Sequence, residues 1–403
     1  MRMSLRSPRV ALGLAFTSLI FAGCSAGAPE DGAQSQDAIV DVPHTAVERQ
    51  SIGNCWLYAH ATWLESMHKA AKAEGEPDLD VSQSYWTYWH WLDRIARSDF
   101  NTATGEIQTG GSWNVARDIA LRYGVMLEKD FEDSQLPGAS GLEPEMSLRQ
   151  KEALEALKPV LTTGVLSTPA ARRDRALVQQ ELNKAWRLDE AVVKELDALF
   201  GPGGTRALGN DVARTAGTKV LHPASIMVKY VTAPGAAPVE RTFAQAMNEW
   251  REVNFWGGDR RSYETRIQKA LHEAQPVIVT WLVDFQAQEH TGTEASPRGS
   301  FSLAKLNSLP TVGSQGGHMT VLEDYEATLA SGELVAAGVT LDPVADKAKF
   351  DALLETGTNI RFFRTKNSWG TSRSDRGEVA GFPGYHDLFT DYLFTPIPYC
   401  NHD

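Results

Sequence analysis

The apolar residues in the first part of the chain recur with a helical period. Apolar side chains return every three or four positions over residues 55–73, and similar patterns cover residues 81–96 and 113–123. This spacing places them on one face of an α-helix. The aromatic stripe of the second stretch is typical of a buried core face. Gly124 follows the third stretch, where a C-cap residue is expected.

Residues 147–200 are dominated by Leu, Ala, Glu, Lys and Arg at helical spacing. They predict an inserted helical segment, which the glycine-rich residues 201–209 close as a linker. Two more helices are expected over residues 243–253 and 263–273. The pattern then changes, because β-branched and aromatic residues dominate residues 276–285, and residues 319–327 and 359–365 are further strand candidates. These are predicted strands, and helices followed by strands indicate an α+β fold with two unlike halves.

The N-terminal residues have the features of an export signal. Three arginines precede an apolar run of 13 residues, 10–22, which is too short to span a membrane. The run ends in Ala22-Gly23-Cys24, which resembles the lipobox of bacterial lipoproteins. The resemblance implies that Cys24 is lipidated and that the protein is exported and anchored to the bacterial envelope, with the outer membrane expected from Ser25. A plain secretory signal with a coincidental cysteine is the alternative.

Charge and cysteine content narrow the possible functions. The net charge is −12 and becomes −15 if residues 1–23, which hold three arginines and no acids, are removed. This acidic balance argues against nucleic acid as a partner. Besides Cys24 the chain has only Cys55 and Cys400, which is no framework of disulfide pairs. No His-Glu-x-x-His motif or zinc-spaced cysteine pair occurs, so no metal or other cofactor is expected.

The segment Gly53-Asn54-Cys55-Trp56 places a cysteine where a loop becomes a helix. The unpaired N–H groups and the dipole of a helix start favour a thiolate, which is the nucleophilic form of cysteine. Taken alone, such a cysteine is more often a small buried apolar residue. Further along the chain, Gly317-His318-Met319 puts a histidine at the start of a predicted strand, and Lys366-Asn367-Ser368-Trp369-Gly370 follows another.

Together these segments resemble the papain superfamily of cysteine peptidases. The resemblance implies that Cys55 is the nucleophile, His318 the base, and Asn367 the residue that orients the imidazole. It implies that Trp369 shields this pair and that Gln50 helps to hold the oxyanion. Gln50 lies five residues before Cys55, where the family usually has six. His318 and Asn367 lie 49 residues apart, more than is usual in the family, because of a predicted insertion over residues 331–357.

Two further segments resemble the bleomycin hydrolase-like branch of this superfamily. They are Ser82-Gln83-Ser84-Tyr85 and the stretch that begins Gly110-Gly111-Ser112-Trp113. In papain relatives the paired glycines let substrate backbone lie alongside, so Gly110 and Gly111 are substrate-binding candidates; a simple turn is the alternative. The chain stops 33 residues after Gly370, so the cleft-filling tail of bleomycin hydrolases cannot be carried over.

The resemblance implies a papain-like two-lobe α+β fold. We expect a signal peptide (residues 1–23), a flexible tether (24–45) and a peptidase domain (46–403). Within the domain we expect a helical lobe over about 46–130, a helical insertion over about 131–260, and a β-barrel-like lobe over about 261–403. The expected activity is hydrolysis of peptide or protein substrates. The alternatives are a catalytically inactive, surface-tethered binding protein on the same fold and a transglutaminase-like acyltransferase.

Overall fold

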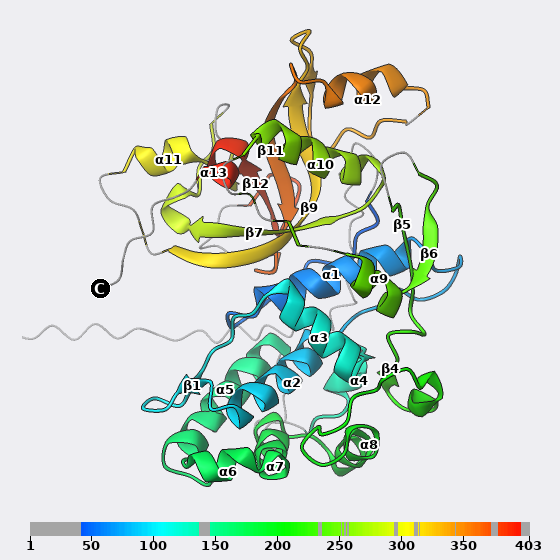
Figure 1. The fold of residues 1–403 in the computed structure, drawn as a ribbon. Helices are drawn as coiled ribbons and strands as arrows, with labels where there is room; N and C mark the ends of the chain where they lie inside the picture. The colour runs from blue at the N-terminus through cyan, green and yellow to red at the C-terminus, as the bar shows by residue number, and fades with distance from the viewer. Residues whose placement is uncertain are drawn as a thin grey trace, which may run out of the picture. The chain divides into compact units, whose positions relative to one another are not determined.

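A computed structural model describes the chain from residue 42 to residue 395. It leaves short gaps at residues 137–145, 233–235, 251, 254, 256–257, 294–296, 310–312, 314, 343 and 372–377. Cys24 and Cys400 therefore lie outside the described residues, as does the predicted signal peptide. The architecture is α+β, as predicted, with helices gathered before the main sheet in the sequence (Figure 1).

The first part of the domain is helical. It consists of α1 (Cys55–Lys69), α2 (Gln83–Ala96), α3 (Trp113–Tyr123) and the short α4 (Glu128–Glu132). The Ser82 side chain accepts a hydrogen bond from the amide of Tyr85 and so caps α2. Gly124 ends α3 with a φ of 76°, a conformation that glycine adopts at little cost, and this confirms the predicted C-cap.

The segment predicted to be helical between residues 147 and 200 forms four helices. They are α5 (Met146–Thr162), α6 (Pro169–Arg173), α7 (Arg175–Trp186) and α8 (Glu190–Phe200). Side chains of Thr168, Asp174 and Asp189 cap the last three by accepting backbone N–H groups. Helices α5 and α7 pack on α2, so the insertion shares the core of the helical part.

Short elements lie between the helices and in the segment that leads from them to the main sheet. They are β1 (Phe100–Asn101), β2 (Glu106–Ile107), β3 (Val125–Met126), the 3₁₀-helix Val212–Thr215, β4 (Val220–Leu221), β5 (Met227–Tyr230), β6 (Val239–Thr242) and α9 (Phe243–Glu249). The strands form three two-stranded pairs, β1 with β2, β3 with β4, and β5 with β6. The sequence pattern did not predict these pairs, because two to four residues show no periodicity.

The second part of the domain is built on one six-stranded sheet. Its strands are β7 (Val277–Asp284), β8 (Ser300–Phe301), β9 (Gln315–Thr328), β10 (Leu334–Val335), β11 (Asn359–Lys366) and β12 (Tyr385–Phe389). Around it lie α10 (Arg260–His272), the 3₁₀-helix Phe285–Ala287, α11 (Leu303–Asn307), α12 (Lys347–Leu354) and α13 (Thr390–Phe394). The pairings among the described residues do not close the sheet into a barrel, so the barrel-like expectation holds only as a β-rich lobe.

Strand β9 is the central strand of this sheet. It pairs antiparallel with β7 and β10 along one edge and with β11 along the other. The predicted insertion between its end and β11 contains β10 and α12, and the two long strands remain neighbours. The side chains of Met319 and Val321 in β9 pack into the hydrophobic cluster of the helical part.

Two hydrophobic clusters lie within the domain, one among the helices and one against the sheet. Helix α1 lies between the sheet and helices α2 and α3 (Figure 1). Residues 42–45 end the segment expected to be a tether, yet Val42 is buried in the sheet cluster and Thr45 donates a hydrogen bond to Glu65. The start of the domain is therefore packed from Val42 onward.

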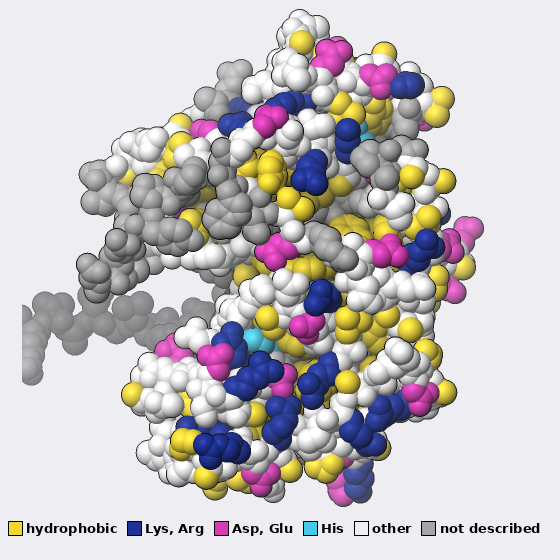
Figure 2. All heavy atoms as spheres, viewed as in Figure 1, with side chains coloured by type: hydrophobic (Ala, Val, Ile, Leu, Met, Phe, Trp, Pro, Cys, Tyr) yellow, Lys and Arg dark blue, Asp and Glu magenta, His cyan; other side chains and the backbone are white. Residues whose placement is uncertain are grey.

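Charged side chains are unevenly distributed over the face drawn in Figure 2. Lysines and arginines gather over the helical part, with acidic side chains scattered among them (Figure 2). Several of these charges form ion pairs, such as Arg94 with Asp99 and Arg175 with Asp93. None of the helices in the part of the chain that the structure describes is long and apolar enough to cross a membrane.

His60 of α1 is a buried ionisable residue in an aromatic cage. Its ring packs against those of Trp86, Trp113 and Phe243, and neither of its ring nitrogens has a hydrogen-bond partner within the described residues. Burial lowers the pKa of His60 to about 3. The folded protein therefore holds a neutral imidazole at pH values where an unfolded chain takes up a proton.

We predict that His60 makes folding less stable at acidic pH. The pKa of His60 in the folded protein lies below its ordinary value of about 6.5. As the pH falls below about 6.5, the unfolded chain takes up a proton that the folded protein does not, so the free energy of unfolding decreases by about 1 kcal/mol per pH unit. Replacing His60 with Phe should reduce the loss of unfolding free energy between pH 7.5 and pH 5 in urea titrations. The exposed His290→Gln change is the control, and an unchanged pH slope in His60→Phe would contradict the interpretation.

Candidate active site

Cys55 is the first residue of α1, at the junction between a loop and the helix. The preceding Asn54 is buried, and its side-chain amide donates to Thr87 Oγ1 at 3.0 Å and to Gln150 Oε1 at 2.9 Å. These bonds tie the start of α1 to α2 and α5. Cys55 is 8% exposed and is a free cysteine among the residues that the structure describes. A buried amide with two partners holds the thiol in a fixed place.

The environment of the Cys55 thiol acts on its pKa in two directions. Burial raises the pKa, whereas hydrogen bonds from the backbone of Met319, Trp56 and Cys55 lower it, and burial has the larger effect. The bonds from Trp56 and Cys55 are the helix-start contribution expected from the sequence. Helix α1 packs on β9, and Cys55 shares a hydrophobic cluster with Met319, the residue that follows His318.

His318 lies within β9, opposite Trp281 of β7. Its Nε2 is 2.8 Å from Asn367 Oδ1, and its ring stacks on that of Trp369 with centroids 4.8 Å apart at 16°. Burial lowers the pKa of His318 to about 4, although the bond to Asn367 acts in the opposite direction. The ring is therefore neutral at pH 7 and is held by contacts on its edge and its face.

The hydrogen bonds of Asn367 assign the proton on the imidazole. Asn367 Oδ1 also accepts from the backbone N–H of Ser368 at 2.7 Å, which identifies this atom as the oxygen. His318 Nε2 must then donate to it. In a neutral ring this leaves the lone pair on Nδ1, so Nδ1 is the nitrogen that can accept a proton from a thiol.

Gln50 is bonded to the segment that follows Asn367. Its backbone N–H donates to Ser368 O at 2.8 Å, and its side-chain oxygen accepts from the Ser368 hydroxyl. Its Nε2 donates one hydrogen to Ile52 O at 2.8 Å and has a second hydrogen to offer. The loop from Gln50 to Cys55 therefore joins the two parts of the site, although it is one residue shorter than is usual in the family it resembles.

Gly110 and Gly111 lie beside Trp56, the residue after Cys55. A Cβ atom built on Gly111 would approach the Trp56 ring to 2.5 Å, and Trp56 Nε1 donates to Thr109 O at 2.9 Å. Nothing lies within 4 Å of a Cβ built on Gly110. Gly111 is thus required by close packing on Trp56, whereas the space beside Gly110 is open to a ligand.

The structure therefore places all the predicted site residues around one junction, formed by the start of α1, the start of β9 and the end of β11. Cys24 is the exception, because it lies outside the described residues. The sequence did not reveal the supporting roles of Asn54 and Gln150. Gln150 is fully buried and also donates to Tyr58 OH and Ser84 Oγ. Its only sequence signal is a polar residue in a helix of ordinary composition.

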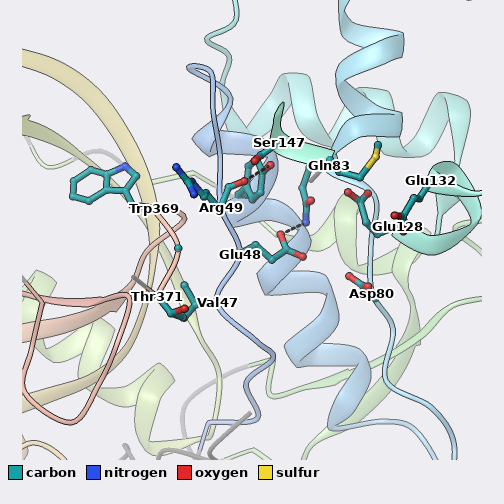
Figure 3. Close-up of a pocket in the computed structure, with 13 residues that line it drawn as sticks. Val47, Glu48, Arg49, Asp80, Gln83, Glu128, Glu132, Ser147, Trp369 and Thr371 are labelled. Atoms are coloured by element: carbon teal, nitrogen blue, oxygen red, sulfur yellow. Dashed lines mark hydrogen bonds between the residues drawn. The ribbon is translucent and has the colours of Figure 1, made fainter. Parts of the chain in front are cut away.

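A cavity of about 500 Å³ lies beyond Trp369 (Figure 3). Its walls include Glu48 and Arg49 from the segment before Gln50, Tyr58 from α1, and Glu128 at the start of α4. Burial and neighbouring carboxylates raise the pKa of Glu48, and mainly burial raises that of Glu128 to about 8. Each of Glu48, Glu65 and Asp80 also has a carboxylate oxygen within 4.8 Å of the others.

Comparisons with known proteins give only distant structural similarity. No protein-family model matches the chain, and no curated protein matches it. Among similar solved structures, xylellain, a cysteine protease from Xylella fastidiosa, is 12% identical over 88% of this chain and 81% of its own, with a TM-score of 0.35. PepW from Lactobacillus rhamnosis is 14% identical over 88% and 78%, with a TM-score of 0.36. At these values the likeness carries no argument about activity.

We predict that His318 activates the Cys55 thiol. Replacing His318 with Ala removes the acceptor nitrogen, so alkylation of Cys55 by iodoacetamide at pH 7 should slow by roughly tenfold or more. In the wild type the rate should fall as pH drops through about 4, where His318 takes up a proton and can no longer accept one. Peptide mass spectrometry measures the rate at Cys55. Equal rates in His318→Ala and in the exposed-site control His290→Ala would refute the assignment.

Proposed function

We propose that the protein is a cysteine-type peptidase that hydrolyses peptide bonds through Cys55, His318 and Asn367. The observation that carries the proposal is the arrangement around His318. Its Nε2 donates to Asn367 Oδ1, and the next residue, Met319, packs in the same hydrophobic cluster as Cys55. A nucleophile, a base and a residue that orients the base are the groups that covalent acyl transfer requires.

In the first half of the reaction, the thiol proton moves to His318 Nδ1 as Sγ attacks the carbonyl carbon of the substrate. Burial disfavours a lone thiolate and a lone imidazolium, but this transfer keeps the net charge of the pair at zero. The N–H of Cys55 and the second hydrogen of Gln50 Nε2 would stabilise the oxyanion. His318 then gives the proton to the leaving amine as the C–N bond breaks, and a thioester remains on Cys55.

The second half regenerates the enzyme. A water molecule gives a proton to His318 Nδ1 as its oxygen attacks the thioester carbonyl carbon. The C–S bond then breaks, the acid product leaves, and His318 returns the proton to Sγ. Throughout, Asn367 holds the ring, and Trp369 stacked on its face excludes water from the bond between them.

We predict graded losses of activity on substitution at this site. Cys55→Ala should abolish cleavage of an internally quenched peptide library. Asn367→Ala should lower kcat/KM by about 100-fold because the ring loses its orientation. Gln50→Ala should lower kcat by about 100-fold if its amide holds the oxyanion. Circular dichroism and thermal melting check that each variant is folded.

The same experiment can refute the proposal. Undiminished hydrolysis by Cys55→Ala would exclude Cys55 as the nucleophile. A wild-type protein that cleaves no peptide and forms no adduct with an epoxide inhibitor of cysteine peptidases would favour an inactive binding protein. Release of ammonia from glutamine side chains in the presence of amines would instead favour the acyltransferase alternative.

We also propose that the protein is exported and anchored by lipid attached to Cys24. The support is the arginine-flanked apolar run that ends at Cys24. In a bacterial host, Cys24→Ala should abolish incorporation of radiolabelled palmitate and move the protein from the membrane fraction to the soluble fraction. The control is Cys400→Ala, which should keep the label. Palmitate labelling of Cys24→Ala equal to that of the wild type would rule out this anchor.

A further inference from the structure

Four carboxyl groups line the cavity beyond Trp369. They belong to Glu48, Asp80, Glu128 and Glu132, and Arg49 is the only basic residue among the described residues of its wall (Figure 3). Glu48 already accepts a hydrogen bond from Gln83, whereas Asp80 and Glu132 are exposed. A positively charged group would favour the ionised forms of these carboxyl groups and so bind more tightly to them.

Two buried polar atoms in the same wall have no hydrogen-bond partner within the described residues. Ser147 is 2% exposed, and its Oγ is one of these atoms. The other is Oε2 of Glu128. Buried polar atoms are nearly always bonded, and a ligand with N–H donors would satisfy both of these atoms. An ammonium or guanidinium group has such donors and the matching charge.

The size and the mixed lining of the cavity favour a long basic side chain over a metal ion. A volume of about 500 Å³ is far more than one ion needs, and Tyr58 and Met146 supply apolar surface in the same wall. The aliphatic stem of lysine or arginine fits such a lining. The carboxylate group of Glu48, Glu65 and Asp80 is less suited to an ion. The oxygens of Glu65 already accept from Val81 N and Thr45 Oγ1, and the charge of Lys366 acts on Glu65 and Glu48.

The position of the cavity indicates which part of a peptide reaches it. Trp369 lies in its wall and stacks on His318, the residue that would protonate the leaving amine. Gly110 and Gly111 lie instead beside Trp56. We propose that the cavity binds a lysine or arginine side chain of the peptide, C-terminal to the scissile bond. This inference rests on the proposed peptidase function.

The test compares internally quenched peptides that carry Lys, Gln or Glu at each of the three positions on either side of the bond. The wild type should prefer Lys to Gln on the C-terminal side by roughly tenfold in kcat/KM. The double variant Asp80→Asn with Glu132→Gln should bring that ratio close to one. Asp80→Lys with Glu132→Lys should favour Glu instead. The control pair, Asp211→Asn with Glu240→Gln, removes the same charge at exposed sites outside the cavity wall and should keep the wild-type ratio.

Three results would overturn the inference while leaving the peptidase function intact. They are cleavage with no charge preference, a preference confined to the N-terminal side, and an unchanged Lys-to-Gln ratio in both cavity variants. Calcium chloride distinguishes the metal alternative. A rise in melting temperature that Asp80→Asn with Glu132→Gln abolishes, together with an unchanged peptide ratio, would assign the cavity to a cation and overturn the inference.

A separate measurement distinguishes failure of the proposed function from failure of this inference. If the wild type cleaves no peptide, the peptidase proposal fails. Fluorescence anisotropy of a labelled lysine-containing peptide with the Cys55→Ala variant then decides about the cavity. Binding that is lost when Asp80→Asn and Glu132→Gln are added supports recognition of a basic side chain. No binding, or binding that these changes leave intact, refutes it.

Discussion

The antiparallel pairing of β9 with β11 is the constraint on which the site depends. In this register Lys366 pairs with Val321, so Asn367 follows directly after β11 while His318 lies three residues before Val321 in β9. The two side chains then meet at 2.8 Å although 49 residues separate them in the chain. The intervening β10 and α12 leave from one end of the pair and return to it, and lengthening a loop in this way has a small entropic cost. The insertion is therefore compatible with an unchanged site.

Burial determines the electrostatics around Cys55 and His318. It raises the pKa of the thiol and lowers that of the imidazole, so each group alone is held neutral. The sequence suggested a thiolate stabilised by the helix start, and those backbone hydrogen bonds are present, but burial outweighs them. A neutral thiol–imidazole pair, whose proton can move from sulfur to nitrogen, is consistent with the raised pKa of Cys55 and with the lowered pKa of His318. Separate charging of either group is opposed by its surroundings.

The sequence predicted elements whose signal is local. The periodicity of residues 113–123 gave α3 with its ends and its glycine cap, and the β-branched residues 276–285 predicted β7. It could not predict β8 or β12. Strand β8 has two residues, and β12, Tyr385–Phe389, lacks clear alternation because its strand is buried on both faces. The sequence pattern also could not predict whether the sheet closes into a barrel, because closure depends on the order in which the strands pair and not on any one strand.

Within the candidate site, the sequence predicted only the residues that lie in recognisable motifs. His318, Asn367 and Cys55 were found because short segments around them resemble a known family. The bond between Gln50 and Ser368, the cage around His60 and the acidic cavity were not predicted. Each joins residues that lie far apart in the chain through tertiary packing, and none has a local pattern. Asp80 and Glu132, for instance, occur in the sequence as ordinary surface carboxylates.

The hydrogen bonds of Gln150 have a consequence for how this chain can be divided. Gln150 belongs to α5, within the segment that interrupts the family-like regions, yet it accepts from Asn54 directly before the candidate nucleophile. Deleting the segment would remove one of the two acceptors of the buried Asn54 amide. The free energy of unfolding would fall by about 1–3 kcal/mol, at the residue that fixes the start of α1. The insertion is thus a structural part of the site and not a detachable module. Chimaeras or minimal versions of this protein must keep α5, or must supply another acceptor in its place.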